Sequence, residues 1–543
     1  MNKNNTIYIC LSLIILTTII STKAQNNWLH IFLSEGRINT GKLSELDSIT
    51  FIKSKATDND LSQDYDPQRK NAGRIADRIK HYNREDTEND DVIPNDSITT
   101  DSLSIPFDSL LVCRNSIPER YPLSEIDSII TGNNIATMKI EVEGEADITS
   151  KVEYLNANLS VEGNGNCADF APAAVSIRGR GNTSWSCPKK SYRLKFAKKQ
   201  SLCGLKKAKS FALIANYLDP SMLENVVASE IARRLDMPYT NSWTPINLYI
   251  NGAYRGLYFL TEKIGINSGS VNINEDTGIL WELDSYFDDE PKFRSPIFNL
   301  PVMLKDPDPA DMVADDFSEE DFINFWTQDF INLENSILSY TPGGEADNEA
   351  EEPDESEEND DKSDDATSDW MDHMDADSLV KYLIVNNVCG NHELCSPKSV
   401  YMYKPDYESK YFMGPIWDFD WGFNFPLFNS TYAYNSILFW NPSHPGSLFF
   451  KSMMKDPRAM DIYKDVWNRF MEEVYPELEM IIDQWVDKLY VGALQNAAAW
   501  PAGKYTNYII PATSEIKKHA ANLKTWIKNR IEYLDKAPNA GLF

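Results

Sequence analysis

Hydrophobic positions alternate along some parts of the chain and recur every three or four residues along others. The stretch INLYINGAYRGLYFLTE, residues 246–262, holds two alternating segments on either side of Asn251-Gly252. Because this residue pair tolerates the positive φ angles of a tight turn, the pattern predicts a β-hairpin. The apolar residues between 222 and 235 recur every three or four positions, as on one face of a helix, and the same spacing is found after about Ser436. Mixed strands and helices predict an α+β fold with a C-terminal helical region.

The first 24 residues have the pattern of a secretory signal peptide. Lys3 precedes an apolar run from Ile7 to Ile20, and the small residues Thr22 and Ala24 follow. We therefore predict cleavage after Ala24 and a secreted protein in the periplasm or at the cell surface. Since no later segment reaches the about 18 consecutive apolar residues of a membrane span, no transmembrane segment is expected.

The remaining chain divides by composition. The passages LSELDSITF at 43–51 and LSEIDSIIT at 123–131 form a weak internal repeat, which predicts small β-rich modules before the main body. Polar, charged residues between them are typical of a flexible linker. The predicted organisation is a module at 25–54, a linker at 55–101, a second short repeat at 102–135, and a main domain at 138–535 with a disordered acidic insertion at 343–369.

The charge of the chain excludes one class of partner. Its 82 acidic and 52 basic residues give a net charge of −30, which repels nucleic-acid phosphates, so we expect no nucleic acid. Residues 345–369 alone hold fourteen acidic residues and one lysine, too dense a charge for a packed core. Calcium binding by this insertion is the alternative, although the segment lacks the spaced pattern with a glycine turn that calcium loops use.

Cysteines are sparse for a chain exported from the cytosol. Of the seven, Cys10 lies in the apolar run of the signal peptide, and six remain after it. Any disulfides would be local and would not form the framework of the fold. Cys389 and Cys395 either bridge or stay as two unpaired buried cysteines.

The stretch GPIWDFDWGF, residues 414–423, places two aspartates among large aromatic residues. In an extended strand Asp418 and Asp420 would project from one side, while Trp417 and its aromatic neighbours would face the other. Two carboxylates on one side suit Mg²⁺ or Mn²⁺. The alternative is a strand with a solvated acidic face.

A basic stretch, SIRGRGNTSWSCPKKSYRLKF at 176–196, stands out in this acidic chain. Its glycines let backbone amides approach a ligand, and its positive charges suit phosphate oxygens. Cations with a carboxylate pair meet the minimal requirement for phosphoryl transfer. The alternative is an edge strand with a basic outer face. The six positive residues are Arg178, Arg180, Lys189, Lys190, Arg193 and Lys195.

A third stretch, NNVCGNHELCSPKSVYMYK at 386–404, precedes the aspartate pair by about 25 residues, the length of one strand pair. It offers Glu393 or His392 to orient a nucleophile or a metal. A lone histidine in a loop is more often an incidental polar residue.

The ordered blocks of the chain resemble the CotH family of spore-coat-type atypical protein kinases. The resemblance spans roughly residues 140–535. It implies a divergent kinase-like fold that binds ATP with a divalent metal, Mg or Mn, and phosphorylates proteins. The matching blocks are Arg178–Lys195, Asp219–Asn225, Asn251–Glu262, Pro397–Tyr403 and Gly414–Asp420.

The resemblance also implies roles for single residues. Asp418 occupies the position of the metal-binding aspartate; Asp420 is assigned as the second metal ligand from the spacing of the pair alone. Arg178, Arg180 and Lys190 fall in the basic strands expected to face the nucleotide. The further expectations are that Glu262 pairs with Lys190 and that Tyr192 and Trp417 stack on adenine.

One block departs from the family. Spore-coat members carry an aspartate thought to be catalytic where this chain reads Asn391-His392-Glu393. If Glu393 replaces that aspartate, the carboxylate is kept on a side chain that is one methylene longer.

The hypothesis is therefore a secreted atypical kinase that transfers phosphate from ATP to a protein hydroxyl, with Glu393 and Asp418 as catalytic residues. Two alternatives stay open: an inactive kinase-shaped adhesin or assembly factor, and an enzyme that transfers AMP from ATP. The sequence specifies neither the acceptor protein nor the oligomeric state.

Overall fold

The computed structural model divides the chain into two units, Met1–Asn134 and Ile135–Phe543. In the first unit it describes little beyond six strands. The predicted signal peptide, the linker and nearly all of the acidic insertion therefore lie outside the described residues. In the second unit it describes residues 135–288, 291–309, 318–339, 369–423, 433–505 and 508–536.

The first unit contains two three-stranded sheets, in the orders β2-β1-β6 and β3-β4-β5. The predicted module at 25–54 contains β1 to β3, and the predicted repeat segment at 102–135 contains β4 to β6. Each sheet therefore joins the hairpin of one repeat to the third strand of the other, so the two repeats form one unit by exchanging a strand. The strands are β1 (Trp28–Leu33), β2 (Ile38–Lys42), β3 (Leu46–Ile52), β4 (Ser109–Arg114), β5 (Ile117–Pro122) and β6 (Ile126–Gly132).

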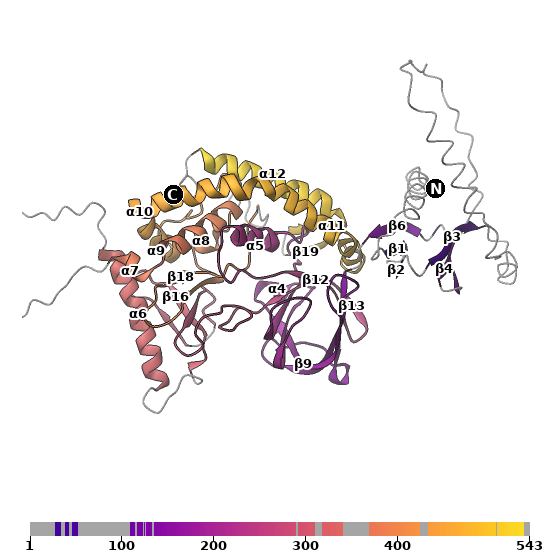
Figure 1. The fold of residues 1–543 in the computed structure, drawn as a ribbon, viewed down its shortest axis with the longest axis horizontal. Coiled ribbons are helices and arrows are strands. Elements are labelled where there is room, and N and C mark those ends of the chain that lie inside the picture. The colour runs from indigo at the N-terminus through magenta and orange to yellow at the C-terminus, as the bar shows by residue number, and fades with distance from the viewer. Residues whose placement is uncertain are drawn as a thin grey trace, which may run out of the picture. The chain divides into compact units, whose positions relative to one another are not determined.

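The second unit begins with a closed barrel in the order β10-β11-β13-β12-β7-β8-β9 (Figure 1). The predicted hairpin is confirmed: β12 and β13 pair antiparallel around Asn251 and Gly252, both with positive φ. Alternating apolar side chains such as Ile140, Leu194 and Leu213 fill the interior. The strands are β7 (Ala136–Val142), β8 (Leu155–Glu162), β9 (Phe170–Arg180), β10 (Ser191–Gln200), β11 (Ala208–Ile214), β12 (Thr244–Ile250) and β13 (Ala253–Glu262).

A second, open sheet follows the barrel in the chain, with the order β15-β16-β14-β17-β18. Its buried strand β14 runs between β16 and β17 and pairs antiparallel with both. The strands are β14 (Ile279–Leu283), β15 (Lys292–Arg294), β16 (Pro301–Asp306), β17 (Val400–Lys404) and β18 (Phe412–Met413).

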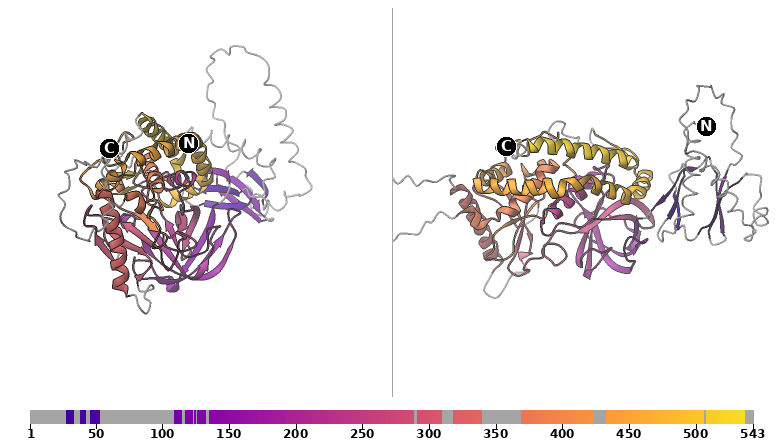
Figure 2. Two further views of the ribbon diagram at one scale, coloured as in Figure 1. Left: turned by 60° about the vertical axis from the view of Figure 1, so that its left-hand side comes forward. Right: turned by 45° about the horizontal axis from the view of Figure 1, so that its top comes forward.

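Helices pack on this sheet, and side chains from both share one large apolar core. The long helices α11 and α12 run alongside each other (Figure 2). Helix α11 also contacts strand β13 of the barrel. The α+β class and the helical C-terminal region are confirmed; the closed barrel was not predicted. No helix in the described part of the chain has the length and apolar character of a membrane span. The main helices are α5 (Glu224–Arg234), α6 (Glu319–Ser339), α8 (Ala376–Cys389), α9 (Pro445–Met454), α10 (Pro457–Arg469), α11 (Tyr475–Ala499) and α12 (Ile516–Asp535).

A buried arginine on α12 ties this helix to the rest of the unit. Arg530 is fully buried, and its guanidinium donates to the Asn387 carbonyl oxygen (2.8 Å), the Asn387 Oδ1 (2.7 Å) and the Tyr434 carbonyl oxygen (2.9 Å). Burial lowers the pKa of Arg530 to about 10. Because Asn387, near the end of α8, is also fully buried, the side chain fixes α12 against the end of α8.

Replacing Arg530 with methionine is expected to reduce the free energy of unfolding by about 3–5 kcal/mol, because several buried acceptors would lose their donor. Urea unfolding measures the change. Lys528→Ala, at an exposed position of the same helix, serves as the control and is expected to change stability by less than about 0.5 kcal/mol. A loss for Arg530→Met no larger than that of the control would contradict the role given to the arginine.

Candidate active site

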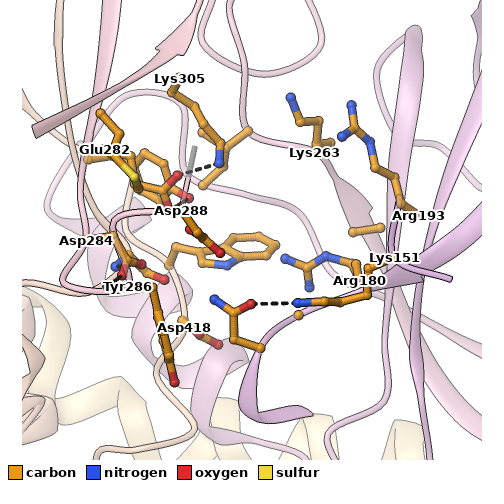
Figure 3. Close-up of a pocket in the computed structure, with 18 of the residues that line it drawn as sticks. Lys151, Arg180, Arg193, Lys263, Glu282, Asp284, Tyr286, Asp288, Lys305 and Asp418 are labelled. Atoms are coloured by element: carbon orange, nitrogen blue, oxygen red, sulfur yellow. Dashed lines mark hydrogen bonds and ion pairs between the residues drawn. The ribbon is translucent and has the colours of Figure 1, made fainter. Parts of the chain in front are cut away.

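A cavity of about 1040 Å³ lies between the barrel and the second sheet. Strands β9, β10 and β11 supply one wall, which is mainly basic. Strands β14 and β16 and the segment around Asp418 supply the other, which carries most of the carboxylates (Figure 3). Charges of opposite sign therefore face each other across an open space large enough for a nucleotide-sized ligand.

The two aspartates of the GPIWDFDWGF stretch both line this cavity. The segment is irregular and not the extended strand that we predicted, because Asp418 has a left-handed φ of 66°. As a consequence Trp417 and Trp421 also line the cavity and do not face away from it. The Phe419 N–H between the aspartates donates to Asn225 Oδ1 at 2.9 Å, so the start of α5 holds the segment in place.

The side chains of Asp418 and Asp420 lie close enough to change each other's pKa. Burial raises the pKa of Asp418, and the nearby Arg180 opposes this shift. Burial and the Asp418 carboxylate raise the pKa of Asp420 well above its usual range. Although Asp418 is open to the cavity, protein surrounds it on its other sides. Two such neighbouring carboxylates share a proton unless a cation replaces it.

The donor set agrees with a magnesium-type ion only in part. Among the described residues no group of three or more histidine, cysteine, aspartate or glutamate side chains is arranged to hold a metal. Magnesium, however, is commonly bound by one or two carboxylates together with water and substrate phosphates. Asp418 and Asp420 therefore fit such an ion when phosphate oxygens complete its coordination.

The basic wall comes from alternate residues of adjacent strands. Arg178 on β9 lies directly opposite Arg193 on β10, and both side chains line the cavity together with Arg180 and Lys195. Like charges directly opposite each other on a sheet are destabilising, so this pair favours an anionic ligand. The Arg180 guanidinium lies 5.3 Å from the centre of the Trp417 ring, and the charge of Asp418 acts on it. Of the residues predicted to bind the nucleotide, Arg178, Arg180 and Trp417 thus reach the cavity.

Three predicted residues do not reach it, and this is a correction to the sequence-based assignment. Lys190 donates to the Trp185 carbonyl oxygen, and Tyr192 stacks on Tyr258 in the barrel with ring centres 6.1 Å apart. Glu262 accepts from the Ser242 N–H at 2.9 Å, and no Lys190–Glu262 pair is present in the described part of the chain. Tyr192 points to the opposite face of β10 from Arg193, because side chains alternate along a strand.

Glu393 also lines the cavity, in a short 3-10 turn, His392–Leu394, that follows α8. The Asn391 side chain caps this turn by accepting from the Glu393 N–H at 3.3 Å. Burial, followed by the charge of Asp418, raises the pKa of Glu393 well above its usual range, while Lys398 opposes the shift. His392 is buried and bonds to Ser436 Oγ at 2.8 Å. Of the two candidates in this stretch, only Glu393 faces the cavity.

Sequence reasoning missed several cavity residues. Glu282 and Asp284 project into the cavity from β14 and the residue after it, and Lys305 on β16 pairs with Glu282. Lys398 lies 5.3 Å from the ring centres of both Tyr286 and Trp421. The signal that could have found the acids is their spacing of two in ILWELD, where they interrupt an otherwise apolar buried strand.

Comparison with protein families identifies the second unit. The family described as "CotH kinase protein" matches residues 177–534, which is more than half of the chain. The chain belongs to the CotH family. The matched residues include both aspartates, Glu393 and the basic residues of β9 and β10. No curated protein matches this CotH chain.

The contact between Asn225 and Phe419 gives a testable prediction for this CotH protein. In Asn225→Ala the buried Phe419 N–H loses its acceptor, so the free energy of unfolding is expected to fall by about 1–3 kcal/mol. Nucleotide affinity is expected to weaken as well, because the aspartates on both sides of Phe419 lose their fixed position. Asn156→Ala, which removes an exposed hydrogen bond to Glu143, is the control. Wild-type stability and affinity in Asn225→Ala would contradict the positioning role.

Proposed function

We propose that this CotH-family protein is an atypical protein kinase with a divergent kinase-like fold, which transfers the γ-phosphoryl group of ATP to a protein hydroxyl with the help of Mg²⁺ or Mn²⁺. The observation that carries the proposal is the meeting of the Asp418–Asp420 pair with the basic barrel wall across one cavity. Family membership supports the same reaction. We further propose that the protein acts after export from the cytosol.

Binding in this proposal divides between the two walls. Asp418 and Asp420 hold the divalent ion, which supplies charge neutralisation on the phosphates and polarises the transferred group. Arg180 and Arg178, which line the same cavity as Asp418, neutralise the remaining phosphate charge from the barrel side. Because no covalent intermediate is required, positioning and electrostatic stabilisation provide the rate enhancement.

Glu393 acts on the acceptor. Its carboxylate takes the proton of the attacking hydroxyl, whose oxygen forms a bond to the γ-phosphorus while the bond to the oxygen of ADP breaks. The neighbouring Lys398 favours the ionised form of Glu393 that this role needs. A bound cation at Asp418 and Asp420 would act in the same direction, since it cancels the negative charges that raise the pKa of Glu393.

The direct test uses ATP labelled at the γ-phosphate with Mg²⁺ or Mn²⁺. The purified full-length protein serves as enzyme and acceptor, together with a mixture of peptides that contain serine, threonine and tyrosine. Metal-dependent incorporation of the label into protein or peptide is expected. No incorporation with either metal, with either acceptor, would contradict the proposal.

A second candidate function is a binding protein without turnover, such as an adhesin or an assembly factor. The observation that favours it is Glu393 at the position where the family carries an aspartate. Thermal unfolding with nucleotide and metal separates the two candidates in part, because a protein without a nucleotide site would gain no stability from any Mg²⁺–nucleotide pair.

A further inference from the structure

The ends of the cavity differ in chemistry. At one end Tyr286, 47% exposed, and Trp421 both contact the ammonium group of Lys398. We call these three residues the aromatic end. Flat aromatic faces that project into a cavity suit a nucleobase, because every base has a π-face on which they can stack.

At the other end three cations lie close together: Arg193 from β10, Lys263 directly after β13, and Lys305 from β16. We call these three residues the basic end. Burial, followed by the charges of Arg193 and Lys305, lowers the pKa of Lys263 to about 7. The structure describes no hydrogen bond from the Lys263 Nζ. The carboxylates of Asp306 and Glu282 oppose the lowering of the Lys263 pKa in part. Because the three cations nevertheless repel one another, this end favours a multiply charged anion more than an uncharged base.

Asp418 of the aspartate pair lies on the same side of the cavity as Tyr286 of the aromatic end (Figure 3). The charges of Lys398, in the aromatic end, and of Glu282 both act on Asp418. Glu282 in turn pairs with Lys305 and acts on Lys263. Figure 3 shows Lys305, Lys263 and Arg193 at one side of the cavity, and Tyr286 and Asp418 together at the other.

A triphosphate nucleotide that matches the chemistry of the two ends places its base at the aromatic end and its terminal phosphates at the basic end. The phosphorus nearest to Asp418 is then the α-phosphorus. This orientation is opposite to the one that presents the γ-phosphate to the aspartates, where the base would have to occupy the basic end.

We propose that the cavity also binds ATP in this reversed orientation and transfers AMP to a protein hydroxyl. The inference rests on the nucleotide and metal site of the proposed function. It adds a second activity and assigns Arg193, Lys263 and Lys305 to the leaving group.

The reaction is balanced without a further reactant. The acceptor oxygen forms a bond to the α-phosphorus, and the bond from that phosphorus to the oxygen bridging to the β-phosphate breaks. Diphosphate leaves, and the hydroxyl proton passes to the Glu393 carboxylate. The product is a phosphodiester between AMP and the protein, while the cations of the basic end neutralise the charge that develops on the diphosphate.

Parallel reactions with ATP labelled at the α- or the γ-phosphate test the proposal, with the full-length protein, Mn²⁺ and the intact mass of the product as a second readout. Incorporation of the α-label and a mass increase of one adenylyl group are expected. Incorporation of the γ-label alone, with a phosphoryl increment, would overturn the reversed orientation and leave the kinase proposal standing. Incorporation of neither label would overturn both, and the α-label alone would overturn only the kinase proposal.

A variant tests the basic end itself. Lys263→Ala is expected to lower α-label incorporation at least about tenfold, since a hydrogen bond to a charged group is lost, and to lower the ratio of α- to γ-label. Lys206→Ala, at an exposed lysine of the same barrel that does not line the cavity, is the matched control. Thermal unfolding of both variants verifies folding. An unchanged label ratio in a folded Lys263→Ala protein would contradict the assignment.

Discussion

Replacing Asp418 with asparagine is expected to lower group transfer from ATP by about 10³-fold or more. Asparagine keeps the size of the side chain but removes a charged ligand of the cation, and the bound ion contributes several kcal/mol of transition-state stabilisation. The initial rate of γ-label incorporation at saturating Mn²⁺ measures the effect.

Two further measurements make the Asp418 result specific. Stability without ligand is expected to stay level or to rise, because the substitution removes the negative charge that raises the pKa of the neighbouring Asp420. Asp276→Asn, at an exposed position outside the cavity, controls for the loss of a negative charge and is expected to keep wild-type transfer. A folded Asp418→Asn protein with wild-type transfer would show that the aspartate does not hold the ion.

The second large effect is expected at Glu393. Glu393→Gln removes the proton acceptor at almost constant volume, so kcat is expected to fall about 10²- to 10⁴-fold while the nucleotide Kd changes little. Glu393→Asp keeps the carboxylate and restores the residue type found in the spore-coat members, and it is expected to retain more activity than the glutamine variant.

Steady-state kinetics of both Glu393 variants, with nucleotide affinity measured separately by calorimetry, separates a role in proton transfer from a role in binding. Glu275→Gln, an exposed glutamate outside the cavity, is the control. Equal losses in the aspartate and glutamine variants would argue against proton transfer by this carboxylate.

Local features of the fold followed from the sequence. The turn at Asn251-Gly252 was predictable because the conformation of a two-residue turn depends on the residues within it. The helix α5 and the helical C-terminal region were predictable because a strong 3.6-residue spacing has few alternatives. The strand exchange in the first unit was not, since pairing between segments more than 50 residues apart leaves no local pattern.

The sequence predicted which two segments form the candidate site, but it did not predict every residue that lines the cavity. The basic stretch and the aspartate pair were found because both are unusual for their surroundings. Which face of β10 meets the cavity depends on how the barrel closes, so Lys190 and Tyr192 were chosen where Arg193 and Lys195 line the wall. The left-handed φ of Asp418 also depends on tertiary contacts, including the one from Asn225 to Phe419.

The most direct test of the account is a crystal structure with Mn²⁺ and a non-hydrolysable ATP analogue, with the ion located by its anomalous signal. An ion is expected at about 2.0–2.3 Å from carboxylate oxygens of Asp418 and Asp420, with phosphate oxygens completing its coordination and facing Arg180. The direction of the nucleotide would also decide between the two orientations. An ion or nucleotide bound elsewhere, or a cavity that stays unoccupied at saturating ligand, would contradict the central claim.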